Sequence, residues 1–164
     1  MQGQYRQALR QFLVGGLGRR FLIGHRHLQC DRLGFDGVLR RTPLFIAHQG
    51  RLYPQLSIAT LMTALGKFPQ PVIKIAPAGI DALKLGKTTI PLEPNGAMMI
   101  NYRGPRRTFP YISAADILED RVSPEQLNGK IIFVGTSAAG LKDIRISPLD
   151  EVYPGVEVHA TLVD

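Results

Sequence analysis

Cysteine is almost absent from this sequence, and its scarcity excludes two kinds of structure. The only one, Cys30, has no partner for an internal disulfide and cannot build a zinc site with other cysteines. Long apolar runs are also missing, because no stretch approaches the roughly 20 residues that a membrane-spanning helix needs. Near the start, Arg19 and Arg20 follow the short apolar segment FLVGGLG too soon for a signal peptide. We therefore expect no targeting or anchoring segment among these residues.

Acidic residues are scarce in the first third of the chain. Residues 1–51 hold nine arginines and two acids, whereas residues 52–164 hold 11 basic and 11 acidic residues, so the net charge of +7 belongs to the first part. These arginines are scattered and lack interleaved aromatic side chains, so a nucleic-acid partner is not expected. A surface near lipid headgroups, or solubility alone, explains the basic segment better.

The composition fits one globular domain over residues 1–164, since 45% of the residues are hydrophobic and 20% are charged. Apolar spacing predicts an amphipathic helix over residues 5–13, and the turn around residues 34–37 predicts a β-hairpin. Further helices are expected over residues 56–65, 113–120, 123–129 and 156–164, and further strands over residues 71–76, 83–92 and 97–104. The continuous apolar run KIIFV, residues 130–134, is typical of a strand buried on both faces. The predicted fold is therefore α/β, with a mixed sheet, a buried central strand, flanking helices and a β-hairpin element.

The segment GKIIFVGTSAAGLKD, residues 129–143, resembles the start of a phosphate-binding loop. Gly135 and Gly140 have the separation of a Walker A motif, in which a lysine follows the second glycine directly. Here Leu141 occupies that position, so nucleotide binding is not expected.

The same segment has half of a nucleophile elbow. Ser137, Asp150 and His159 follow one another in the chain order of a Ser-Asp-His hydrolase, but they span only 23 residues. Ala139 replaces the second glycine that permits the tight strand-to-helix turn. A loop hydroxyl that satisfies turn amides is the favoured interpretation of Ser137, and a small soluble hydrolase that uses it stays an alternative.

The histidines raise two further possibilities. His25 and His27 point to one face if they lie in a strand, and His48 on a neighbouring strand could join them in a metal site. No carboxylate stands nearby at ligand spacing, so no metal and no cofactor are expected. His159, beside Glu157, would sense pH if it were partly buried, although packing at a helix start is the simpler role.

Three longer segments together resemble a known family. They contain, in order, the patterns D-G-V-x-R-R, I-N-Y-x-G, G-K-I-x-x-V-G-T-S-A-x-G-L-x-D and P-G-V-E-V-H-A. Over roughly residues 20–164 the sequence resembles the type-two CHASE domain, the cyclase- and histidine-kinase-associated sensory extracellular domain. The resemblance implies the extracytoplasmic sensor of a bacterial membrane receptor, non-catalytic itself. The output module of such receptors is commonly an adenylate or diguanylate cyclase, or a kinase.

The sequence departs from the family's pattern in two ways. The N-terminal portion that family members usually carry, a transmembrane helix and a strand-helix-strand unit, is largely absent, and Ser147-Pro148 stands where the family usually has Thr-Pro. We therefore expect a soluble C-terminal portion of the domain, truncated relative to the family. A sheet edge left open by the missing elements would be able to pair with a second copy.

A ligand site is expected in the loop after KIIFV, because ligands favour the carboxyl ends of strands in α/β sheets. Thr136, Ser137 and Asp143 would supply hydrogen bonds there, and Arg103 would balance a ligand's charge. In the alternative, the same hydroxyls and Asp143 only tie the loop down.

The resemblance also implies partners and a location. The partners are an unknown small-molecule or physical stimulus, the transmembrane helices and the cytoplasmic output domain of the same receptor. The location is the periplasmic face of the bacterial inner membrane. A homodimer is possible, and a dimerisation scaffold without a ligand is the remaining alternative.

Overall fold

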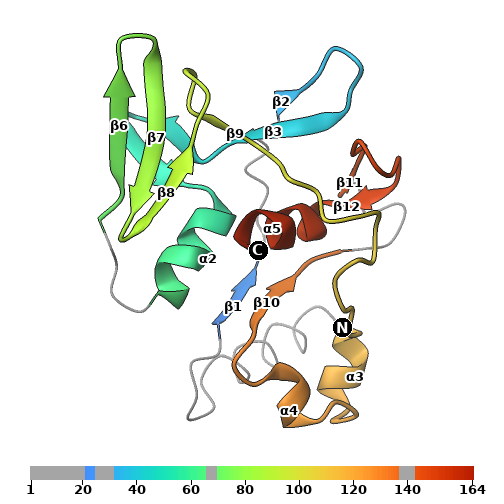
Figure 1. Cartoon of the computed structure of the whole chain (residues 1–164). Coiled ribbons are helices and arrows are strands. Elements are labelled where there is room, and N and C mark those ends of the chain that lie inside the picture. Colours follow the sequence, from blue (N-terminus) through green and yellow to red (C-terminus); the bar gives the residue numbers. More distant parts are fainter. Residues whose placement is uncertain (1–20, 25–31, 66–69, 137–142) are drawn as a thin grey trace.

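The computed structural model describes residues 21–24, 32–65, 70–136 and 143–164, and it folds as small sheets around helices (Figure 1). The helices of these residues are α2 (Leu56–Ala64), α3 (Ala114–Leu118), α4 (Pro124–Leu127) and α5 (Gly155–Val163). The strands are β1 (Phe21–Gly24), β2 (Arg32–Leu33), β3 (Leu39–Pro43), β4 (Phe45–His48), β5 (Arg51–Pro54), β6 (Val72–Ala76), β7 (Gly79–Leu85), β8 (Thr88–Pro91), β9 (Ala97–Met99), β10 (Ile131–Val134), β11 (Ile144–Arg145) and β12 (Tyr153–Pro154). The predicted α/β class is confirmed, while the helix predicted over residues 5–13 lies outside the described residues.

The run KIIFV forms strand β10, as predicted, and pairs in parallel with β1. Helix α5 packs on β10, and α2 packs on both α5 and β1, so the two helices lie beside this sheet (Figure 1). The burial of β10 is lower than its sequence predicts, because Ile131 is 37% exposed and the next three side chains are half-buried. Among the described strands, β1 is the only one that pairs with β10, which explains the difference.

The predicted hairpin forms between β2 and β3. Its turn is closed by the amide of Gly37, which donates to the carbonyl of Gly34 at 2.9 Å, and by the amide of Val38, which donates to Asp36 Oδ1 at 3.1 Å. Gly37 has φ +75°, a conformation that favours glycine. The strands on either side are shorter than the apolar pattern indicates, because the segments beyond them pair elsewhere, as β1 with β10 and as β4 with β5.

Strands β6, β7 and β8 form an antiparallel sheet that Figure 1 shows above α2. Alternation in β7 places Leu83 and Leu85 inside and Lys84 outside, as a half-buried strand requires. Leu83 joins Leu44 and Ile58 of α2 in one hydrophobic cluster. Burial of each such side chain contributes about 1.5–3 kcal/mol. The strands predicted over residues 71–76 and 83–92 are confirmed.

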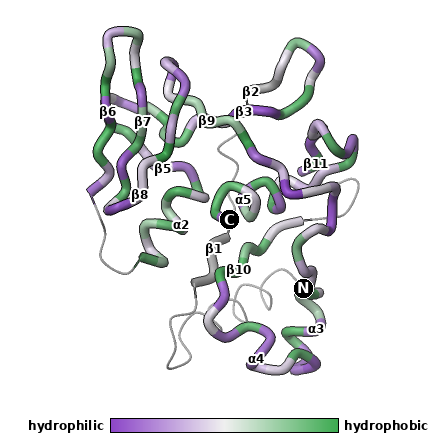
Figure 2. The backbone as a smooth tube through the Cα atoms, in the orientation of Figure 1, coloured by the Kyte–Doolittle hydropathy of each residue, from purple (hydrophilic) through white to green (hydrophobic). Residues whose placement is uncertain are grey.

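A second hydrophobic cluster surrounds α5. It consists of Leu39, Ile100, Tyr153 and Val158, and the ring of Tyr102 meets that of Tyr153 edge-on with centroids 5.1 Å apart. The contact between α2 and α5 joins the two clusters, and Figure 2 shows the apolar residues that run through both helices. Within the described part of the chain, none of the helices combines the length and the apolar composition needed to cross a membrane.

Candidate functional site

The four residues predicted to bind a ligand do not gather at one point. Thr136 is exposed at the end of β10, and Ser137 lies outside the described residues. Asp143 is buried at the start of α5, whereas Arg103 forms an ion pair with Asp164, just past the end of that helix. Nine residues of helix separate these two positions by about 13 Å. A role in ligand binding stays a prediction for these residues.

Asp143 anchors the first residue of α5. The carbonyl of Asp143 accepts the amide of Gly155 at 2.8 Å, and a Cβ on Gly155 would lie only 2.3 Å from Asp143 Oδ1. The carboxylate also lies 3.7 Å from Nη2 of Arg145, and both side chains are largely buried. Only glycine therefore fits at the helix start, and Asp143 has a structural contact with α5.

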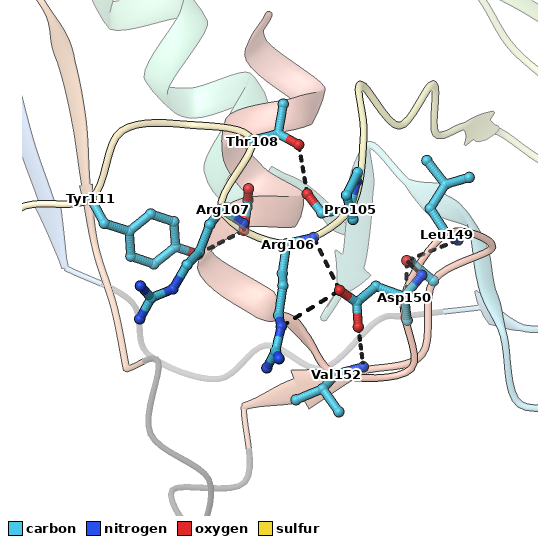
Figure 3. Close-up of polar contacts among 10 residues, drawn as sticks. Pro105, Arg106, Arg107, Thr108, Tyr111, Leu149, Asp150 and Val152 are labelled. Atoms are coloured by element: carbon cyan, nitrogen blue, oxygen red, sulfur yellow. Dashed lines mark hydrogen bonds and ion pairs between the residues drawn. The ribbon is translucent and has the colours of Figure 1, made fainter.

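The most extensive polar cluster involves a segment that we call the strap, residues 103–111 with the sequence RGPRRTFPY. It contains no helix or strand and crosses α5 near its first turn (Figure 3). Locally it is folded by the hydroxyl of Thr108, which donates to the carbonyl of Pro105 at 2.6 Å. Gly104 lies against this hydroxyl, since a Cβ there would be 2.5 Å from Thr108 Oγ1.

One carboxylate of α5 receives the inner side of the strap. Glu157 is 2% exposed, and its Oε2 accepts the amide of Arg107 at 3.0 Å and the hydroxyl of Tyr111 at 2.7 Å. Its Oε1 accepts the amide of Phe109 at 3.3 Å. Three donors from the strap therefore converge on a single acidic side chain.

The electrostatics of this contact explain how a carboxylate tolerates burial. A buried charge is costly unless hydrogen bonds satisfy it, and Glu157 has three donors as well as a position in the first turn of α5, where the helix dipole favours negative charge. Burial, and next the hydrogen bond donated to Glu157, hold the pKa of Tyr111 well above its ordinary value. Tyr111 is therefore a stable donor throughout the physiological range.

Two further acids attach the outer side of the strap. Asp150 Oδ2 accepts the amide of Arg106 at 3.2 Å and lies 3.7 Å from its Nε (Figure 3), and Arg103 pairs with Asp164. The amide of Val152, and then Arg106, hold the pKa of Asp150 below its ordinary value. The three acids that contact the strap lie seven residues apart along the chain, before, within and after α5.

His159 attaches the other side of α5. Its Nδ1 lies 2.9 Å from the hydroxyl of Ser57, a fully buried residue of α2, and its ring stacks on Phe133 of β10 with centroids 6.2 Å apart. Of the hydrolase residues considered from the sequence, Asp150 therefore contacts the strap and His159 contacts α2. In the described residues, both side chains contact segments that neighbour α5.

Of the histidines considered from the sequence as metal ligands, the structure describes His48. His48 is exposed at the end of β4, and His25 and His27 lie outside that part of the structure. Across residues 21–24, 32–65, 70–136 and 143–164, no group of three His, Cys, Asp or Glu side chains could hold a metal ion.

Sequence reasoning missed the contact between Tyr111 and Glu157. The signal for it was weak but present, because Glu157 is the only acidic residue in the apolar helix GVEVHATLV. An acid surrounded by apolar neighbours needs donors from elsewhere in the fold. Its partner lies 46 residues away, and nothing in the local pattern identifies it.

Comparison with known proteins gives one family. The profile described as the CHASE2 domain matches residues 5–164, so the match begins earlier than residue 20 and covers nearly the whole chain. The four sequence patterns described above all lie within it. No match was found among the curated proteins or among the solved structures.

Proposed function

This chain belongs to the CHASE2 family of extracellular sensory domains, and we propose that it is the input domain of a bacterial transmembrane receptor. In this proposal the domain lies on the periplasmic side of the inner membrane. It regulates a cytoplasmic output module, which is an adenylate or diguanylate cyclase or a kinase, and has no catalytic activity of its own.

The observation that supports the proposal best is the number of different segments attached to α5. The strap binds it through Glu157, α2 through the pair of Ser57 and His159, and the end of β10 through Gly135, the residue after the strand, which lies close to Val156. A Cβ on Gly135 would lie 2.6 Å from Cβ of Val156, so the chain leaving β10 is in direct contact with the helix. A change in any one of these segments acts on the same helix, as a sensory domain with two conformations requires.

The use of the polar side chains supports a non-catalytic role. Asp143, Glu157 and His159 would be candidates for acid-base chemistry, yet each contacts the backbone or side chain of a neighbouring segment. Perturbed pKa values often mark functional sites, but ion-pair and hydrogen-bond networks perturb them too. The raised pKa of Tyr111 belongs to such a network.

The proposal is tested on the complete reading frame of the gene. A receptor requires membrane-spanning segments and an output domain in that frame, and a frame without them contradicts the proposal.

A second test looks for the stimulus. Metabolites are first screened against the 164-residue chain by thermal shift, because a ligand that binds only the folded state raises the melting temperature. A compound that raises it is expected to change the output activity of the receptor in membrane vesicles. If the output activity is the same after deletion of the domain, the regulatory role is wrong.

A further inference from the structure

We infer that the strap is a releasable clasp on α5, and that its release and the opening of the first turn of α5 are one conformational event. This inference rests on the proposed sensory function and names the element that regulates it. The strap joins two of the patterns that mark the family, because it begins with the last two residues of I-N-Y-x-G, Arg103 and Gly104, and binds the glutamate of P-G-V-E-V-H-A.

Among the described residues, the hydrogen bonds from the inner side of the strap to α5 all end on one group. Glu157 is buried, and all three of its donors described above come from the strap. If the strap lifts, this carboxylate loses all three donors in one step. The first turn of α5, which carries Glu157, loses its attachment to the strap in that step, so we expect the turn and the strap to open together. The clasp therefore has two arrangements, closed and open, rather than a continuous range.

The outer side of the strap faces solvent and is held weakly. The side chains of Arg103 and Arg106 are 57% and 56% exposed, and their ion pairs with Asp164 and Asp150 are of the exposed type that adds little stability. An external stimulus can therefore reach the strap from outside. The strongest attachment, at Glu157, lies beneath it.

The backbone of the strap favours release. Arg107 has φ +67°, a left-handed conformation that residues other than glycine adopt rarely, and its amide is one of the three donors to Glu157. Such a conformation persists only where neighbouring contacts hold it. Opening of the clasp relaxes this residue, so the closed arrangement depends on the Glu157 hydrogen bonds.

The test is amide hydrogen exchange of the 164-residue chain and three variants, followed by mass spectrometry. Glu157→Gln keeps the side-chain shape but replaces one of the two acceptor oxygens with an NH2 group. This group cannot accept a hydrogen bond from the strap. Tyr111→Phe keeps the ring and removes a single donor. Asp116→Asn is the matched control, because it changes an exposed carboxylate that pairs with Arg121 at the end of α3, away from the clasp.

We expect Glu157→Gln to accelerate exchange in the strap and in residues 155–163 together, by about tenfold or more, since a hydrogen bond to a charged group contributes at least that factor. Tyr111→Phe should accelerate the same two segments by a smaller factor, and it serves as the test if Glu157→Gln does not fold. In the wild-type protein, both segments should exchange faster than β7, residues 79–85, because they open without unfolding of the whole protein.

Two results overturn the inference. If the strap accelerates while residues 155–163 do not, release and helix opening are separate events. If the strap and residues 155–163 exchange in the wild type no faster than global unfolding in urea allows, they do not open as a separate clasp. Neither result bears on the sensory role, because the exchange experiment contains no output module, and the receptor assay described above fails or succeeds independently.

Discussion

The hydroxyl of Tyr111 donates a 2.7 Å hydrogen bond to the buried carboxylate of Glu157, joining two segments that lie 46 residues apart. This bond connects an irregular strap to the first turn of α5. Because its acceptor is charged and shielded from water, it should contribute more than an ordinary neutral hydrogen bond.

Replacement of Tyr111 by phenylalanine should lower the free energy of unfolding by about 1.5–3 kcal/mol, the range for a hydrogen bond to a charged group. Urea denaturation measures this change. Tyr53→Phe is the control, since Tyr53 is an exposed tyrosine of β5, and it should change stability by much less. Equal effects of the two variants would contradict the importance of the bond to Glu157.

The effect of Tyr111→Phe should also be independent of pH between 6 and 9. The pKa of Tyr111 is raised above its ordinary value of 10.0, so its contribution is complete below pH 10 and is lost only as the pH rises through the folded-state pKa. Repeating the denaturation at both pH values checks this. A difference that shrinks by pH 9 would show that the phenol loses its proton more easily than the buried hydrogen bond implies.

Gly155→Ala should destabilise the protein by about 1–3 kcal/mol, as overpacking of a close contact does. The cause is the 2.3 Å approach of the new Cβ to Asp143 Oδ1. In a double-mutant cycle, the same substitution in an Asp143→Ala background should cost less, because the clashing carboxylate is gone. An equal cost in both backgrounds would mean that the helix start, rather than Asp143, excludes the side chain.

Asp150→Asn should reduce the stability of the protein at neutral pH and less so in acid. The folded-state pKa of Asp150 lies below its ordinary value of 3.8, chiefly because the amide of Val152 donates to it. Its contribution is therefore present above about pH 3.8 and is lost as the pH falls through the lower folded-state value. Thermal unfolding from pH 7 to pH 3 should show the two proteins converging. A constant difference in melting temperature would contradict the role of this carboxylate.

Ser57→Ala should weaken the attachment of α5 to α2 by about 0.5–1.5 kcal/mol, the usual net contribution of one hydrogen bond. Ser57 is fully buried, so its hydroxyl bonds to His159 without competition from bulk water. Equilibrium unfolding in urea measures the loss. A stability equal to that of the wild type would show that the stacking of His159 on Phe133 holds the helix without Ser57.

Local signals in the sequence predicted individual elements well. Ser113 begins the helix predicted over residues 113–120, and as the N-cap of α3 its side chain accepts the amide of Ala115. The glycine at position 86 separates β7 from β8, and the apolar run KIIFV forms β10. Each of these features depends on residues within a few positions of one another.

Contacts between distant segments were not predictable in the same way. The parallel pairing of β1 with β10 joins residues more than 100 positions apart, and a strand's own sequence does not name its partner. For the candidate site, the sequence predicted a ligand contact for Asp143 or, alternatively, a role in tying down the loop, and it did not predict the contact of Asp143 with Gly155. It placed Arg103 there on charge alone, and the helix between Arg103 and Asp143 shows why charge is a poor guide to position.

The most direct test of signalling through α5 is the output activity of the complete receptor in membrane vesicles. Three proteins are compared: the wild type, Glu157→Gln and Asp116→Asn. The proposal predicts that Glu157→Gln changes the basal output activity, because the clasp on α5 is weakened, while Asp116→Asn leaves it at the wild-type level. Identical output from all three proteins, with the strap of Glu157→Gln exchanging faster than that of the wild type, would contradict transmission of the signal through α5.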